Sequence, residues 1–119
     1  MTTRQTGLAG EERAAQFLVA KGYKIIARNY NAAGGELDLV ARRGQTLVFA
    51  EVKTRAYAAF GGPAAAVTRT KQERLTRAAL QYIKANAPKF DSIRFDVLCV
   101  LPEAIEHIEN AFFPRRTTL

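Results

Sequence analysis

The sequence predicts an α/β protein in which helices flank a mixed central sheet. Two observations predict this class: helical periodicity in residues 8–21 and 68–86, and three short apolar segments joined by turns between them. A strongly apolar segment at 92–101 and a shorter one at 105–112 follow. The expected order is α-β-β-β-α-β-(β), and the length suits a single domain, 1–119, with one core.

The first helix is expected to run from about Leu8 to Lys21 and to end at Gly22, a residue type that often follows a helix C-terminus. Its core-facing side chains are expected to be Leu8, Ala14, Ala15, Leu18 and Val19. Glu11 falls in the middle of this face, where an unpaired carboxylate is costly to bury. We therefore expect Glu11 to join an acidic site. The alternatives are a carboxylate favoured by the helix dipole and a partner for a nearby arginine.

Three antiparallel strands are expected next, beginning at Tyr23, Glu36 and Thr46. If residues 42–45 form the turn between the second and third strands, Ala41 pairs with Thr46. That register places Asp38 diagonally across from Glu51 on one face of the sheet. Diagonal neighbours have Cβ atoms roughly 7–8 Å apart, so the two carboxylates can hold one cation between them.

Charged side chains are embedded in these two apolar strands. Alternation of side chains predicts that Leu37 and Leu39 face one way and Asp38 the other, while Lys53 projects from the same face as Glu51. Carboxylate oxygens suit Mg²⁺ or Mn²⁺, and a nearby lysine suits the charge that develops during phosphodiester hydrolysis. The alternative is a solvated sheet edge, which charged residues commonly protect.

The second helix is expected from Thr68 to Asn86, with Pro88 ending it. Its predicted core face is Leu75, Ala78, Ala79, Tyr82 and Ile83.

The net charge of +7 suits a polyanionic partner, although it is also compatible with an anionic membrane or with solubility alone. The expected nucleic-acid-binding residues are Arg55, Lys71, Arg74 and Arg77. A charged helix stripe that is simply solvated is the alternative.

Other chemistries receive less support. Cys99 is alone and lies in an apolar segment, so we expect a reduced, buried thiol. His107 is the only histidine and is expected to be a surface or packing residue, which excludes a histidine-rich zinc site and makes a Ser-His-Asp hydrolase improbable. Asp96 is expected to be a structural hydrogen-bond acceptor. Aromatic residues in the 57–63 loop could stack on bases or pack on the core.

No apolar run is long enough to span a bilayer, and no signal-peptide pattern follows Met1. We therefore expect a cytoplasmic protein without membrane contact. The expected partner is nucleic acid, and a homodimer is compatible with the sequence.

The chain resembles the YraN-type family of uncharacterised bacterial proteins in the PD-(D/E)xK nuclease superfamily, which is related to archaeal Holliday junction resolvases. The resemblance extends over nearly the whole chain. It rests on Gly10-Glu11, Ala14-Ala15, Gly22-Tyr23, Arg28-Asn29-Tyr30, Gly35-Glu36-Leu37-Asp38-Leu39-Val40, Val48-Phe49-Ala50-Glu51-Val52-Lys53-Thr54-Arg55, Phe60-Gly61, Lys71, Arg94-Phe95-Asp96-Val97 and Asn110-Ala111-Phe112.

The resemblance implies a restriction-endonuclease-like core and a metal-dependent endonuclease acting on DNA, with branched or damaged DNA as candidate substrates. Asp38 and Glu51 would be metal ligands, Lys53 the catalytic lysine, and Glu11 a further ligand or ligand orienter. The cofactor would be Mg²⁺ or Mn²⁺. The alternative function is a nucleic-acid-binding module with this fold and no significant catalysis. Leu37 stands where the superfamily usually has proline, a departure that removes no ligand.

Overall fold

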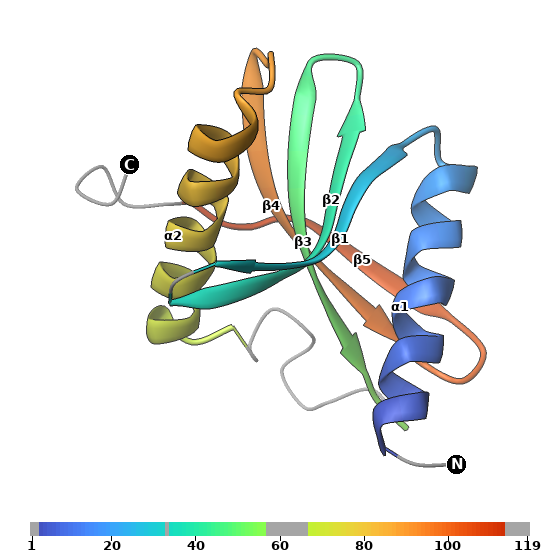
Figure 1. The fold of residues 1–119 in the computed structure, drawn as a ribbon. Coiled ribbons are helices and arrows are strands. Elements are labelled where there is room, and N and C mark those ends of the chain that lie inside the picture. Colours follow the sequence, from blue (N-terminus) through green and yellow to red (C-terminus); the bar gives the residue numbers. More distant parts are fainter. Residues whose placement is uncertain (1–2, 33, 57–66, 114–119) are drawn as a thin grey trace.

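The computed structural model describes residues 3–32, 34–56 and 67–113. Their order confirms the prediction and includes the last, optional strand (Figure 1). The elements are α1 (Thr3–Ala20), β1 (Lys24–Ala32), β2 (Gly35–Arg43), β3 (Thr46–Thr54), α2 (Arg69–Asn86), β4 (Ser92–Val100) and β5 (Ile105–Phe112). The loop at 57–63, with its aromatic residues, lies outside the described residues.

The five strands form one mixed sheet in the order β1-β2-β3-β4-β5. β3 and β4 are parallel, and the other neighbours are antiparallel. A parallel pair needs a crossover connection, and α2 lies within the connection between β3 and β4. The mixed sheet therefore follows from inserting a helix into what is otherwise a meander.

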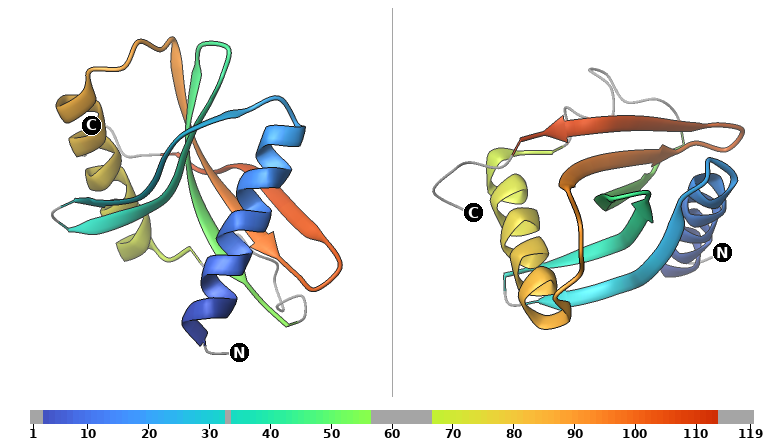
Figure 2. Two further views of the ribbon diagram at one scale, coloured as in Figure 1. Left: turned by 45° about the vertical axis from the view of Figure 1, so that its right-hand side comes forward. Right: turned by 90° about the horizontal axis from the view of Figure 1, so that it is seen from above.

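The two helices cover opposite faces of the sheet (Figure 2). Ala14, Ala15 and Leu18 of α1 pack with Leu39 and Val48 of the sheet. A second cluster joins the core face of α2 to the other side of the sheet; it contains Leu37, Val40, Phe49, Leu75, Ala78, Ala79, Tyr82 and Phe95. Among the described residues, no helix is long and apolar enough to cross a membrane.

The ends of the helices agree with their sequence signals, with one correction. Thr68 caps α2 by accepting a hydrogen bond from the backbone of Lys71, and Ala87, in the left-handed region, precedes Pro88. α1 begins earlier than predicted, at Thr3.

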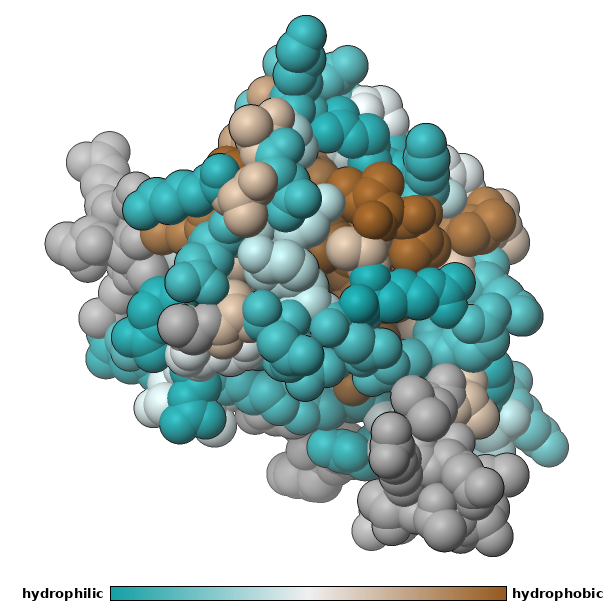
Figure 3. All heavy atoms as spheres, in the orientation of Figure 1, coloured by the Kyte–Doolittle hydropathy of each residue, from teal (hydrophilic) through white to brown (hydrophobic). Residues whose placement is uncertain are grey.

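Val19 is 55% exposed, so its assignment to the core face of α1 is wrong. It lies about 100° around the helix from Leu18. Figure 3 shows a hydrophobic area over this end of α1 and the start of β1.

The register between β2 and β3 also differs from the prediction. Arg43, not Ala41, pairs with Thr46, so the connection is the two-residue turn Gly44-Gln45. Gly44 has φ of 61°, a conformation that glycine adopts without a steric penalty. β2 therefore continues two residues closer to the turn than predicted, whereas β3 begins at Thr46 as predicted. The register that placed Asp38 diagonally across from Glu51 is wrong, since Leu39 pairs with Ala50.

β2 loses one of its two neighbouring strands at Asp38. Its pairing with β3 extends only as far as Leu39, opposite Ala50, whereas its pairing with β1 continues to Gly35. Leu37 consequently packs in the core beneath α2 and Leu39 in the core beneath α1, so the prediction that they share a face is wrong. The divergence of β2 from β3 opens the sheet beside the acidic residues.

Candidate functional site

Asp38 lies where β2 leaves β3, and its side chain takes over a hydrogen bond to the neighbouring strand. The backbone N–H of Val52 donates to Asp38 Oδ2 over 2.8 Å. This bond anchors the carboxylate at the opening of the sheet. The point where β2 leaves β3 therefore also fixes the position of the Asp38 carboxylate.

Glu51 is the buried carboxylate of the site, with only 5% of the residue exposed. Lys53 Nζ lies 3.1 Å from Glu51 Oε1, and Lys71 from α2 forms an ion pair with the same oxygen. The other oxygen, Oε2, is buried and has no hydrogen-bond partner in the described part of the chain. A buried carboxylate oxygen without a partner is costly, so this atom calls for a ligand.

A cavity of about 390 Å³ opens beside these residues. It is lined by Gly35, Glu36, Asp38, Glu51, Thr68, Thr70, Lys71, Arg74 and Leu75. The acidic side chains come from β2 and β3, whereas the hydroxyl and basic side chains come from the start of α2. The cavity therefore has an acidic wall facing a basic one.

Burial dominates the electrostatics of Asp38 and raises its pKa to about 6. The hydrogen bond from Val52 opposes this rise, while the charges of Glu11, Glu51 and Glu36 add to it. For Lys53, burial lowers the pKa, and the neighbouring ammonium of Lys71 acts in the same direction. A cation near Asp38 would relieve the repulsion among the carboxylates.

Asp38→Asn is expected to stabilise the metal-free protein at pH 8 and to have little effect at pH 4. The raised pKa of Asp38 means that the folded state holds a proton which the unfolded state has lost, so the carboxylate reduces stability as pH rises from about 4 to about 6. The asparagine oxygen can still accept from Val52. The gain at pH 8 should reach roughly 3 kcal/mol at most. Denaturant unfolding in EDTA measures it, with exposed Asp91→Asn as the control. An equal effect at both pH values would contradict the argument.

Glu11 lies beside the acidic site without lining the cavity. With its amide nitrogen turned toward the acids, Asn29 donates to Glu11 Oε2 at 3.0 Å and to Glu36 Oε1 at 3.2 Å. Asn29 has φ of 50°, a left-handed conformation that asparagine tolerates better than most residues. Burial raises the pKa of Glu11, partly offset by Asn29. Glu11 thus acts on Asp38 through its charge, and Asn29 links Glu11 to Glu36.

The expected nucleic-acid-binding residues do not all lie together. Lys71 and Arg74 line the cavity, and Arg77 lies one helical turn further along α2, near Gly34 at the β1–β2 turn. Arg55 lies elsewhere, beside a separate cavity of about 310 Å³ that Gly10, Arg13 and Leu101 also line. Only part of the predicted basic set therefore surrounds the acidic residues.

The donor set fits a divalent cation held by two carboxylates. Glu51 offers an unpartnered buried oxygen, and Asp38 is a neighbouring carboxylate whose charge is disfavoured by burial. No group of three or more His, Cys, Asp or Glu side chains is placed to hold a metal within the described ranges. Mg²⁺ is commonly bound through one or two carboxylates with water completing the octahedron, so Asp38 and Glu51 suffice.

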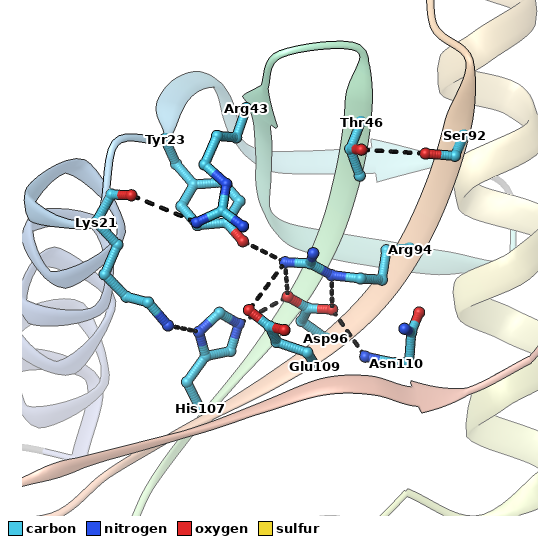
Figure 4. A network of polar contacts seen from close by, with 10 residues as sticks. All are labelled: Lys21, Tyr23, Arg43, Thr46, Ser92, Arg94, Asp96, His107, Glu109 and Asn110. Atoms are coloured by element: carbon cyan, nitrogen blue, oxygen red, sulfur yellow. Dashed lines mark hydrogen bonds and ion pairs between the residues drawn. The ribbon is translucent and has the colours of Figure 1, made fainter.

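Asp96 belongs to a different polar network, between α1 and the sheet (Figure 4). It accepts two hydrogen bonds of 2.8 Å from Arg94, one of 2.7 Å from His107 and one from the backbone of Asn110. Asp96 is therefore a structural acceptor, as predicted. The prediction of a surface or packing role for His107 misses its polar role, because its buried ring bridges Asp96 and Lys21. Cys99 is buried, as predicted.

Sequence reasoning missed several residues of the site. Thr68, Thr70 and the ion pair between Lys71 and Glu51 depend on how α2 packs across the sheet, and no local pattern signals that contact. Asn29 had one available signal, since it is among the residues on which the family resemblance rests, although no role was assigned to it.

A family model and individual relatives match this chain and agree on one protein family. The model of the uncharacterised protein family UPF0102 matches residues 10–100. A UPF0102 protein from Syntrophomonas wolfei is 49% identical over 113 residues, covering 92% of this chain and 98% of the relative. The UPF0102 protein YraN of Escherichia fergusonii is 44% identical over 114 residues, covering 94% of this chain and 87% of the relative.

A solved structure shares the fold. Hjc of Archaeoglobus fulgidus, a Holliday junction resolvase from an archaeal hyperthermophile, matches with a TM-score of 0.52 at 20% identity, covering 91% of this chain and 80% of that one. The expected nuclease-like architecture is thereby confirmed. Because the family model and relatives span most of the sequence, the chain belongs to the uncharacterised protein family UPF0102.

Proposed function

We propose that this protein is a metal-dependent endonuclease-like enzyme that hydrolyses phosphodiester bonds in DNA. One observation carries the proposal: the buried Glu51 leaves an oxygen unpartnered beside Asp38, in a cavity whose opposite wall is basic. Such a cavity suits a cation and a phosphate at the same time. The shared fold with a protein described as a Holliday junction resolvase makes DNA the preferred polyanion.

In this mechanism Asp38 and Glu51 would hold the divalent cation. Mg²⁺ or Mn²⁺, when bound, would polarise the phosphate and make a water more acidic. Lys71 and Arg74 bind phosphate oxygens from the α2 wall, and their fixed positive charge stabilises the negative charge that grows during hydrolysis. Lys53 holds the Glu51 carboxylate, and Glu11 adds negative charge beside Asp38.

The test is a cleavage screen on duplex, single-stranded, flap and four-way-junction DNA in Mg²⁺, Mn²⁺ or EDTA. Activity should require the metal and should be absent from Asp38→Ala purified in the same way, which controls for contaminating nucleases. Preference for the four-way junction would extend the similarity to the resolvase from fold to substrate. Absence of cleavage on all four substrates would remove the proposal.

The second candidate is a nucleic-acid-binding module without turnover. The ion pairs of Lys53 and Lys71 with one Glu51 oxygen favour it, because they neutralise that carboxylate without a metal. This candidate predicts DNA binding that is unchanged by EDTA and no cleavage on any substrate. The same screen, combined with fluorescence anisotropy, separates the two functions.

DNA binding is expected to weaken steeply with salt, because phosphate contacts release counterions. Arg74→Ala should weaken binding of different sequences about equally and should lower the log–log salt slope by about 1. Lys24→Ala is the matched control, since it lies at the opposite end of the β1–β2 hairpin from Gly35. Anisotropy titrations over a range of salt give both slopes. Affinity independent of salt would contradict phosphate contact.

A DNA substrate would place the protein in the cytoplasm. Homodimer formation remains part of the proposal, since a four-way junction presents two strands to cut. Sedimentation with and without junction DNA would measure it.

A further inference from the structure

The two lysines at Glu51 differ in what else they face. Lys71 lines the cavity together with Asp38, Thr70 and Arg74, whereas Lys53 is not among the described residues that line it. The Lys71 side chain is 35% exposed and that of Lys53 only 16%. An ammonium has three donors, so Lys71 can keep its contact with Glu51 and still direct N–H groups into the cavity.

The start of α2, which carries Lys71, forms the basic wall of the cavity. Thr68 and Thr70 add hydroxyl groups to this wall, and Thr68 fixes the first turn by accepting from the Lys71 backbone. The N-terminus of a helix favours an anion, because its free N–H groups and its dipole are positive there. Buried Glu51, with its unpartnered oxygen, faces the same space. An anion on the α2 wall and a cation on the acidic wall would therefore be neighbours.

We infer that Lys71, carried by α2, is the lysine that contacts the scissile phosphate, and that Lys53 is a positioning residue which holds Glu51 from outside the cavity. This inference rests on the proposed function and departs from the expectation, drawn from family resemblance, that Lys53 is the catalytic lysine. Both ammonium groups contact the same Glu51 oxygen, Oε1, and they lie next to each other there. Lys53 acts on one of its oxygens, while Lys71 reaches both that oxygen and the substrate space.

Thymidine 3′,5′-bisphosphate is the probe, because it presents the two phosphates that flank one nucleotide of DNA. Its binding is measured by calorimetry in Ca²⁺ for the wild type, Lys71→Met, Lys53→Met and Lys84→Met. Lys84 lies on the same helix near its other end and controls for the loss of one charge. Lys71→Met should weaken binding roughly 10- to 100-fold, the range of one charged hydrogen bond, whereas Lys84→Met should change it less than about threefold. Lys53→Met should weaken binding less than Lys71→Met does, because it acts only through Glu51.

Cleavage rates under saturating metal supply the second readout. Lys71→Met should lose roughly 10²–10³ in rate, and Lys53→Arg should recover most of any loss seen in Lys53→Met, because a positioning charge can be replaced. Loss of probe binding in Lys53→Met with normal binding in Lys71→Met would overturn the inference, as would no probe binding by the wild type. If the wild type binds the probe and the variants rank as expected, but the wild type cuts no DNA, the proposed hydrolysis fails. Lys71 then remains the phosphate contact.

Discussion

Glu51→Gln is expected to lower the rate of DNA cleavage by roughly 10²–10³, the scale of removing one electrostatic stabiliser from a preorganised site. The amide keeps the size of the carboxylate but loses its charge. It cannot replace Oε2 as an anionic ligand, and it leaves Lys53 and Lys71 without their common counter-charge. Metal binding and phosphate positioning should therefore weaken together.

Single-turnover cleavage and calorimetry with Mn²⁺ measure these two effects on the same preparations. Glu103→Gln is the matched control, because Glu103 is exposed in the turn between β4 and β5 and its loss changes the net charge equally. Thermal unfolding of all three proteins separates a folding defect from a defect of the site. Equal cleavage and equal Mn²⁺ heats for the wild type and Glu51→Gln would remove Glu51 from the mechanism.

The elements of the fold were predictable because their signals are local. Leu75, Ala78, Ala79 and Tyr82 recur at helical spacing, and all four are buried in α2. Asp38 and Glu51 also stood out locally, as carboxylates embedded in apolar strands. The register between their two strands could not be predicted locally, because the segment Arg42-Arg43-Gly44-Gln45 could form a four-residue or a two-residue turn. The structure adopts the shorter one.

Contacts between elements that lie far apart in the sequence could not be predicted from local patterns. Lys71 was expected to touch phosphate, but its ion pair with Glu51 depends on the packing of α2 across the sheet. The divergence of β2 from β3 at Asp38 also depends on tertiary structure, because β2 stays paired with β1 where it leaves β3. His107 has the same explanation: β4–β5 pairing brings it near Asp96, and the turn after α1 supplies Lys21.

Asp96→Ala is expected to destabilise the protein by about 3–5 kcal/mol, the usual cost of removing one partner from a buried ion pair. The Asp96 side chain is 0% exposed and is the common acceptor for Arg94 and His107. It also receives the backbone N–H of Asn110, where the pairing of β5 with β4 shifts register. Its removal leaves buried donors without an acceptor on two strands, and the melting temperature should fall by roughly 10–20 °C.

The pH dependence gives this prediction a second, independent readout. Burial alone would raise the pKa of Asp96, but hydrogen bonds from His107 and Arg94 outweigh it, and the pKa is lowered. A carboxylate with a lowered pKa contributes stability above its unfolded value near 3.8, and that contribution is lost as pH falls through the folded value. The difference between wild type and Asp96→Asn should therefore be full at pH 7 and should shrink below about pH 4. Denaturant unfolding across this range, with exposed Asp91→Asn as control, measures it. A difference that stays constant down to pH 2 would show that shape, not charge, accounts for the role of Asp96.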